Sequence, residues 1–122
     1  MRTAVQNAQP GDSLILQAGV YPVHELEITK PLTILGKQGA IIDGENQGEI
    51  LIIHADSVNI LNLTIKNVAT SYVKDWAAIS SDKASYCRIE NNKILDTFFG
   101  MYIRKSSHFP IANNQVISNA TL

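Results

Sequence analysis

The segment Val58-Asn59-Ile60-Leu61-Asn62-Leu63-Thr64-Ile65-Lys66-Asn67 decides the fold, because its pattern returns twice along the chain. It aligns with residues 87–96 and again with residues 109–118. Two apolar positions of the pattern recur with the same offsets of 29 and then 22 residues. The first position is occupied by Ile60, Ile89 and Ile111, and the second by Ile65, Ile94 and Val116. A sequence repeat of about 20–50 residues indicates a solenoid, a propeller or another repeat architecture.

Apolar and polar residues alternate within each copy, as in Val58, Asn59 and Ile60. Alternation with a period of two is typical of a β-strand with one buried face. A further short strand precedes each copy, and we expect Ile52, Ile79 and Ile103 to be equivalent residues of this strand. A similar repeat distance predicts one earlier coil. In it we expect Leu26 to be equivalent to Ile50, Ile28 to Ile52, and Leu32 to Val58.

Three short strands in a period of roughly 22–26 residues predict a parallel β-helix of about five coils. Stacked coils pair every strand with its neighbour at a spacing of about 4.8 Å and build a continuous Ile/Val/Leu core. A leucine-rich repeat is the main rival at this period, but neither its Leu/Asn consensus nor a helical segment in each repeat is visible. We therefore predict an all-β solenoid that forms a single domain over residues 1–122.

The recurring pairs Asn91-Asn92 and Asn113-Asn114 are expected at sharp corners of the coils. Asparagine tolerates the left-handed conformation, and stacked amides can hydrogen-bond along the axis. Residues 3–8 precede the turn Pro10-Gly11-Asp12 and predict a short helix that covers the first coil. At the other end no cap is visible, so we expect either further coils of a longer protein or a second copy paired at the open end.

Composition excludes several classes of function. The 122 residues carry a net charge of −1 with scattered basic residues, which argues against a nucleic-acid partner or a polybasic membrane patch. No apolar stretch approaches the roughly 18–20 residues of a membrane span. The single cysteine excludes an internal disulfide.

Several stretches resemble the NosD family of periplasmic copper-handling proteins, which mature nitrous oxide reductase. The matching stretches in the first half are Pro10–Leu16, Gly19-Val20-Tyr21, Lys30–Gly36 and Ile42-Asp43-Gly44. Those in the second half are Tyr72–Ile79, Ile89–Ile94 and Asp96–Ile103. The opening series and the Ile-x-Asn-Asn pattern are shared with carbohydrate-acting β-helices such as pectate lyases, whereas the Asp-Trp insertion followed by Phe-Phe-Gly-Met-Tyr-Ile is more particular to NosD.

The resemblance implies a right-handed β-helix that is exported to the periplasm. It also implies partners, namely the subunits of an ABC transporter and nitrous oxide reductase or a copper chaperone. Family members are longer and carry a signal peptide, so we expect this chain to be an N-terminal fragment. On this interpretation the chain is a copper-binding accessory protein without enzymatic activity.

Copper(I) prefers thioether, thiolate and imidazole ligands. The candidate ligands are His24, His54, His108 and Met101, although no closely spaced pair of them forms a metal motif. The repeat register places Cys87 at the inward position of Val58 and Met101 at that of Ile50. It places His54 opposite Lys105 in a turn, and His108 opposite Ser57 on the outside.

The alternative function is binding or cleavage of a carbohydrate on an outer face of the solenoid. β-Helix lyases and hydrolases need grouped carboxylates, and the candidates are Asp43, Asp75 and Asp82. These three do not occupy equivalent outward positions, so the sequence predicts no paired acid and base. Trp76 and Tyr102 are candidate contacts for a sugar or a protein partner, together with Asp75.

Overall fold

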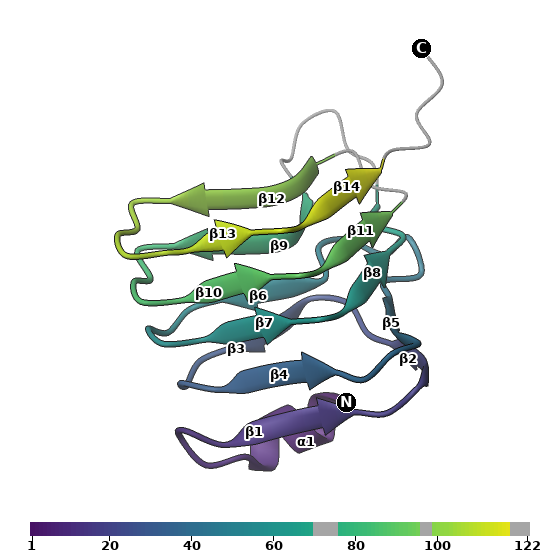
Figure 1. Cartoon of the computed structure of the whole chain (residues 1–122), viewed down its shortest axis with the longest axis horizontal. Coiled ribbons are helices and arrows are strands. Elements are labelled where there is room, and N and C mark those ends of the chain that lie inside the picture. The colour runs from purple at the N-terminus through teal and green to yellow at the C-terminus, as the bar shows by residue number, and fades with distance from the viewer. Residues whose placement is uncertain (70–75, 96–98, 118–122) are drawn as a thin grey trace.

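The computed structural model describes residues 1–69, 76–95 and 99–117, and in this part the chain is a parallel β-solenoid with one short helix. Three sheets, each made of one strand from every coil, surround a single core (Figure 1). Four complete coils and two strands of a fifth are stacked along the axis. The all-β parallel fold predicted from the repeat is confirmed.

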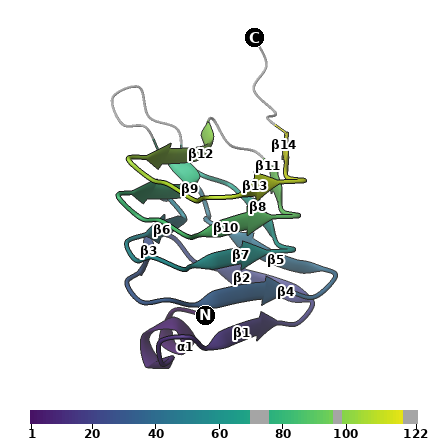
Figure 2. The ribbon, with the colours of Figure 1, turned by 60° about the vertical axis from the view of Figure 1, so that its left-hand side comes forward.

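The strands fall into three sheets, which we name in chain order. The first sheet contains β1 (Ser13–Leu16), β4 (Thr33–Gly36), β7 (Asn59–Leu61), β10 (Arg88–Glu90) and β13 (Ile111–Ala112). The second sheet contains β2 (Gly19–Pro22), β5 (Ala40–Asp43), β8 (Thr64–Lys66), β11 (Lys93–Leu95) and β14 (Gln115–Ile117). The third sheet contains β3 (Leu26–Ile28), β6 (Leu51–Ile53), β9 (Ala77–Asp82) and β12 (Phe99–Arg104), stacked along one side in Figure 2.

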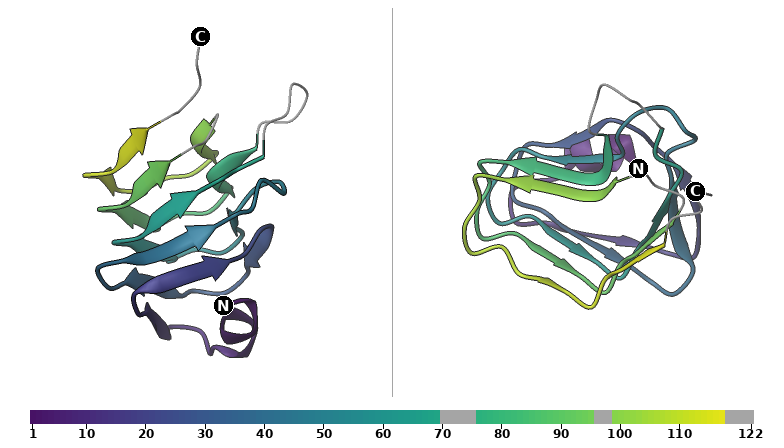
Figure 3. Two further views of the ribbon diagram at one scale, coloured as in Figure 1. Left: turned by 90° about the vertical axis from the view of Figure 1, so that its right-hand side faces the viewer. Right: turned by 90° about the horizontal axis from the view of Figure 1, so that it is seen from above.

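The solenoid is right-handed. In the right panel of Figure 3 the chain is seen from the end of the stack that carries β12, β13 and β14. It passes through these three strands counter-clockwise while it advances towards the viewer. The left panel shows the helix α1 (Arg2–Asn7) at the opposite end, beside the first coil. Val5 of this helix is buried in the core, so the predicted N-terminal cap is present.

Register in the first two sheets follows the sequence repeat. Ile34, Ile60, Ile89 and Ile111 are paired along the first sheet, and Ile42, Ile65, Ile94 and Val116 along the second. From Ile34 to Ile89 and from Ile42 to Ile94 these side chains are fully buried. The inward row of each sheet therefore builds the continuous aliphatic core that the alternation predicts.

The third sheet corrects the predicted alignment by one or two residues. Leu51, not Ile52, pairs with Ile79, and Ile52 pairs with Ser80. Ile103 pairs with Ser81, two residues beyond its expected partner. In the preceding coil Leu26 pairs with Leu51 and Ile28 with Ile53, each one residue later than expected. The physical reason is that residues 50–53 are four consecutive aliphatic residues, so alternation cannot indicate which of them face inward.

Asparagines build the corner between the first and second sheets. Asn62, Asn91 and Asn113 all adopt φ 57°, the left-handed conformation expected at these corners. Asn92 is buried, its amide donates to the Ile60 carbonyl over 3.0 Å, and its Oδ1 accepts from the Leu63 N–H over 2.9 Å. The predicted amide ladder along the axis is therefore present.

Candidate functional site

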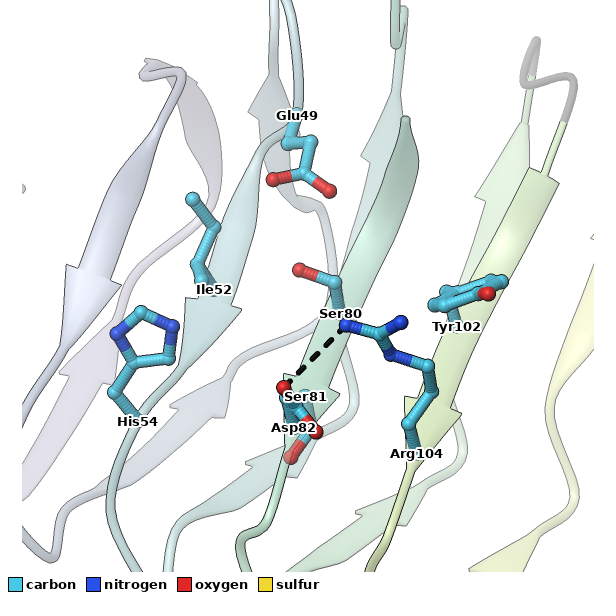
Figure 4. Close-up of a pocket in the computed structure, with 8 residues that line it drawn as sticks. All are labelled: Glu49, Ile52, His54, Ser80, Ser81, Asp82, Tyr102 and Arg104. Atoms are coloured by element: carbon cyan, nitrogen blue, oxygen red, sulfur yellow. Dashed lines mark hydrogen bonds and ion pairs between the residues drawn. The ribbon is translucent and has the colours of Figure 1, made fainter. Parts of the chain in front are cut away.

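An open depression of about 300 Å³ lies on the outer face of the third sheet. It is lined by Glu49, Ile52, His54, Ser80, Ser81, Asp82, Tyr102 and Arg104 (Figure 4). These residues come from β6, β9 and β12 and from the residues directly before and after β6, so three successive coils contribute to one surface. The hydrogen-bonded sheet holds their backbones at fixed spacing, which positions the side chains before any ligand arrives.

Two rows of outward side chains form the depression. Ile52, Ser80 and Tyr102 occupy one row, because Ser80 pairs with Ile52 on one side and with Tyr102 on the other. Asp82 and Arg104 are paired in the second row. His54 directly follows Ile53, the partner of Ser81, so it continues this second row one coil earlier. The rows place an aliphatic and an aromatic side chain next to charged and hydroxyl groups.

Arg104 organises one side of the depression. Its Nη2 lies 3.3 Å from Oδ2 of Asp82, and its guanidinium carbon lies 5.3 Å from the centre of the Tyr102 ring. The guanidinium group is thus held between a carboxylate and an aromatic ring, as the close-up shows (Figure 4). Oδ1 of Asp82 is shielded from solvent and has no hydrogen-bond partner among the described residues. Within this part of the chain, the contact with Arg104 is the ion pair that compensates the charge of Asp82.

Glu49 projects into the depression from the linker between β5 and β6, towards Ser80 (Figure 4). Burial raises the pKa of this carboxyl above its ordinary value, since the charged form is poorly solvated there. A hydrogen bond from Ser80 opposes this shift, the nearby charge of Glu25 adds to it, and His54 lowers the pKa slightly. Among the described residues, no ion pair compensates the Glu49 carboxylate.

The structure brings two of the predicted site residues together, because His54 and Tyr102 both line this depression. His54 lies beside Asp82 and Arg104, so the expected alignment with Lys105 is wrong by one residue. Trp76 is half-buried and packs against the core. Asp75, the remaining predicted contact, lies outside the described residues.

The soft candidate ligands for copper do not converge. His24 follows β2 in the first coil, His54 follows β6 in the second, and His108 precedes β13 at the other end of the stack. Met101 packs against the core, where it pairs with Ile79 in the row of Leu51, not of Ile50 as expected. Within residues 1–69, 76–95 and 99–117 no three histidine, cysteine or carboxylate side chains are grouped around a common point.

The remaining soft donor, Cys87, is also unsuited to bind a metal. Its side chain is fully buried, and its thiol contacts the carbonyls of Ala55 and Ser85. Burial raises the pKa of this thiol, so the thiolate that copper needs is disfavoured at neutral pH. Cys87 and Met101 both face inward, as the register predicts. Within the described residues, the arrangement of these donors does not fit a resident copper ion.

His108 occupies the outward corner expected from the repeat. It is exposed, and its ring stacks on Tyr86 of the preceding coil with ring centres 4.7 Å apart and planes 8° from parallel. This pair lies at the turn before the first sheet and not in the depression. It is therefore a structural stack between two coils.

Five residues of the depression were not among the predicted site residues: Glu49, Ile52, Ser80, Ser81 and Arg104. The ion pair of Asp82 with Arg104 has a signal in the sequence, because the two residues are separated by the 22-residue offset seen between Ile89 and Ile111. Glu49 carries no such signal, since it lies in a linker whose length differs from coil to coil.

The comparisons with known proteins leave the family open. No family model matches the chain, and no curated protein matches it. In the described part of the chain, no helix has both the length and the apolar character that crossing a membrane requires. The fold and the depression are therefore the basis for assigning a function.

Proposed function

We propose that this β-helix binds a carbohydrate in the depression on its third sheet. The observation that carries the proposal is the composition of that depression, in which Tyr102 and Ile52 lie beside Ser80, Asp82 and Arg104. A sugar ring has an apolar face of C–H groups and a rim of hydroxyls, so it needs an apolar surface and hydrogen-bonding groups together. The open shape of the depression suits a short stretch of an oligosaccharide.

Binding is better supported than cleavage. A glycosidase needs one carboxyl that keeps its proton and a second carboxylate that is free to act as base or nucleophile. Burial raises the pKa of the Glu49 carboxyl, which is the direction that a general acid requires. Asp82 does not meet the second need, because Arg104 holds one of its oxygens and the other is shielded from solvent. The sequence likewise favoured a protein without enzymatic activity.

A glycan array followed by calorimetry tests the proposal. The Tyr102→Ala variant should weaken binding of any glycan found by at least about tenfold, since it removes the aromatic surface of the depression. Tyr86→Ala is the matched control, because this tyrosine is 62% exposed and lies outside the depression. Equal losses in the two variants, or an array without binding, would contradict carbohydrate binding at this site.

A second candidate function rests on the resemblance to the NosD family. In that case the chain is part of a periplasmic accessory protein that works with an ABC transporter in copper supply to nitrous oxide reductase. The segments Asp75-Trp76 and Phe98–Ile103 favour it, because they are the more particular part of the resemblance. The copper ligands would then have to come from outside the described residues, since the donors among these do not converge.

Sequencing the DNA that flanks the gene separates the two candidates. Genes for an ABC ATPase, its membrane subunit and a copper reductase beside this reading frame would support the accessory role. Genes for sugar transporters or polysaccharide lyases would support the carbohydrate role. A titration of the purified chain with copper(I) adds a direct measurement, and we expect no tight binding, because Cys87 and Met101 face the core.

A further inference from the structure

The depression on the third sheet has an excess of negative charge. It contains the carboxylates of Glu49 and Asp82 and a single guanidinium group, that of Arg104, which already contacts Asp82. Glu25 lies close enough to act electrostatically on Glu49. A ligand that carries a carboxylate would add a further negative charge, so a polymer of uronic acids fits this surface poorly.

Glu49 is the carboxylate of the depression that has no ion-pair partner among the described residues. Its side chain is half-buried, and the ion pairs of the described residues are Arg88 with Glu90 and Arg104 with Asp82. A partly desolvated carboxylate without a basic partner gains more from an incoming cation than an exposed one does. The depression is open, so a ligand can reach this carboxylate from solvent.

The hydrogen-bonding groups of the depression point to the same kind of ligand. Oγ of Ser81 and Oδ1 of Asp82 are shielded from solvent, so the carboxylate of Glu49 is the acceptor in the depression that a ligand meets without an ion pair among the described residues. Ionised carboxylates only accept hydrogen bonds, and Arg104 is already engaged as a donor. The best complement to the Glu49 carboxylate is a group with several N–H donors. A primary ammonium group has three donors and no acceptor.

We propose that the ligand of this depression is an amino sugar with a free amine, whose ammonium group is held by Glu49. This inference rests on the proposed carbohydrate function and adds the class of sugar. The ring lies against Ile52 and Tyr102, and its hydroxyls bond to the polar groups of the floor. N-acetylation of the sugar removes the positive charge and two of the three donors, so it should weaken binding.

The experiment compares three tetrasaccharides on the intact chain by isothermal titration calorimetry at low ionic strength. These are a β-1,4-linked glucosamine tetramer, its fully N-acetylated counterpart and a galacturonic acid tetramer. We expect the glucosamine tetramer to bind at least tenfold tighter than the N-acetylated one, and the galacturonic acid tetramer to bind most weakly. Added salt should reduce the preference, because screening weakens attraction between a ligand charge and an accessible carboxylate.

Glu49→Gln is the decisive variant, because it removes the charge and keeps the shape of the side chain. It should reduce the preference for the free amine to less than about threefold and leave binding of the N-acetylated tetramer unchanged. Glu45→Gln is the matched control, since this glutamate is exposed and outside the depression. Circular dichroism of both variants verifies that they are folded.

Each negative result of these titrations would contradict a different part of the proposal. Equal affinity for the free and N-acetylated tetramers would overturn the amino-sugar inference and leave carbohydrate binding in place. A preference that survives in Glu49→Gln would overturn the assignment to this residue. Absence of binding by all three tetramers and by every sugar of the glycan array would overturn the proposed function and the inference with it.

Discussion

The adjacent asparagines Asn91 and Asn92 have different structural roles in this solenoid. Asn91 is exposed and adopts φ 57°, so its contribution is conformational. Asn92 is 2% exposed, and its side chain bonds the carbonyl of Ile60 and the N–H of Leu63 in the preceding coil. The first residue turns the chain, and the second joins one coil to the next.

Replacement of Asn92 by alanine should therefore be costly. It removes the bond to the carbonyl of Ile60 and leaves the N–H of Leu63 without its side-chain acceptor, and we expect a loss of about 2–4 kcal/mol in the free energy of unfolding. Urea denaturation monitored by circular dichroism measures it. Asn91→Gly is the control and should change stability by less than about 0.5 kcal/mol, because glycine adopts a positive φ freely. A similar loss in both variants would contradict these separate roles.

Another residue-scale prediction concerns Asp43, which lies at the end of β5. A hydrogen bond from Asn67 of the next coil lowers the pKa of its carboxyl, burial opposes the shift, and the N–H of Glu45 and the charge of Lys66 lower the pKa further. A carboxyl whose pKa is lower in the folded state stabilises the fold above the pKa of the unfolded chain. That stabilisation is lost as the pH falls through the folded pKa.

We therefore expect the free energy of unfolding to decrease on acidification below about pH 4, and to decrease less in Asp43→Asn. Urea denaturation at a series of pH values from 7 to 3 measures the difference between the two proteins. Glu27→Gln, at an exposed position of β3, should retain the slope of the parent protein. Identical slopes in the parent and Asp43→Asn would show that this bond does not contribute.

At the scale of the element, the register of a strand could be predicted from the sequence only where apolar and polar residues alternate regularly along it. Ile60 and Ile65 are each flanked by a residue that faces outward, so the register of the first two sheets was predictable and is confirmed. Residues 50–53 offer four aliphatic side chains in a row, and only packing selects Leu51 and Ile53 as the inward pair of β6. The third sheet was for this reason misaligned by one or two residues.

The candidate site was less predictable than the fold, for a related reason. Tyr102 and His54 were recognised as candidate residues, but their neighbourhood depends on the register of the third sheet. Glu49 has no equivalent in the other coils, because it belongs to the linker 44–50, whereas the preceding coil has only residues 23–25 between the same two sheets. A repeat pattern predicts what recurs, so it cannot predict a residue that occurs once.

Close approach of successive coils sets a second element-scale constraint, at Gly36 at the end of β4. A Cβ atom there would lie 2.5 Å from the carbonyl oxygen of Asn62 and 2.6 Å from Cδ2 of Leu63 in the next coil. Gly36→Ala should therefore lower the free energy of unfolding by about 2–3 kcal/mol, because the coils must separate to admit the methyl group.

Thermal unfolding of the Gly36→Ala variant measures this effect, and Gly11→Ala is its control. Gly11 has a φ of 90° but no atom within 4 Å of the added carbon, so its replacement should cost only the conformational term of about 1 kcal/mol. If Gly36→Ala lowered the free energy of unfolding less than Gly11→Ala, the coils would be able to separate without loss of stability.

At the scale of the whole molecule, the inward rows of the three sheets form one core cluster that extends from Val5 to Ile94. No single coil can bury its inward side chains alone, so each coil depends on the coils above and below it. Ile89 is fully buried within this cluster, between Ile60 and Ile111 in the first sheet.

Replacement of Ile89 by aspartate should unfold the described solenoid and not only its own coil. The substitution places an unpaired carboxylate in a fully apolar environment. Circular dichroism should show loss of the β-sheet signal at neutral pH. His108→Ala, at the exposed corner, should retain the signal and lose less than about 2 kcal/mol, because it removes the stacking contact with Tyr86 and an exposed contact with Ser107. A native spectrum for the Ile89 variant would contradict a shared core.

The unequal linkers between the second and third sheets have a consequence for how such a protein can diversify. Residues 23–25 and 44–50 make the same crossing in successive coils, while the crossing from the first to the second sheet takes two or three residues in every coil of the described part of the chain. One corner of the solenoid thus accepts insertions without disturbing the stack, and Glu49 shows that such an insertion reaches the depression. Evolution, or a designer, could exchange these linkers to alter ligand preference and leave the scaffold unchanged.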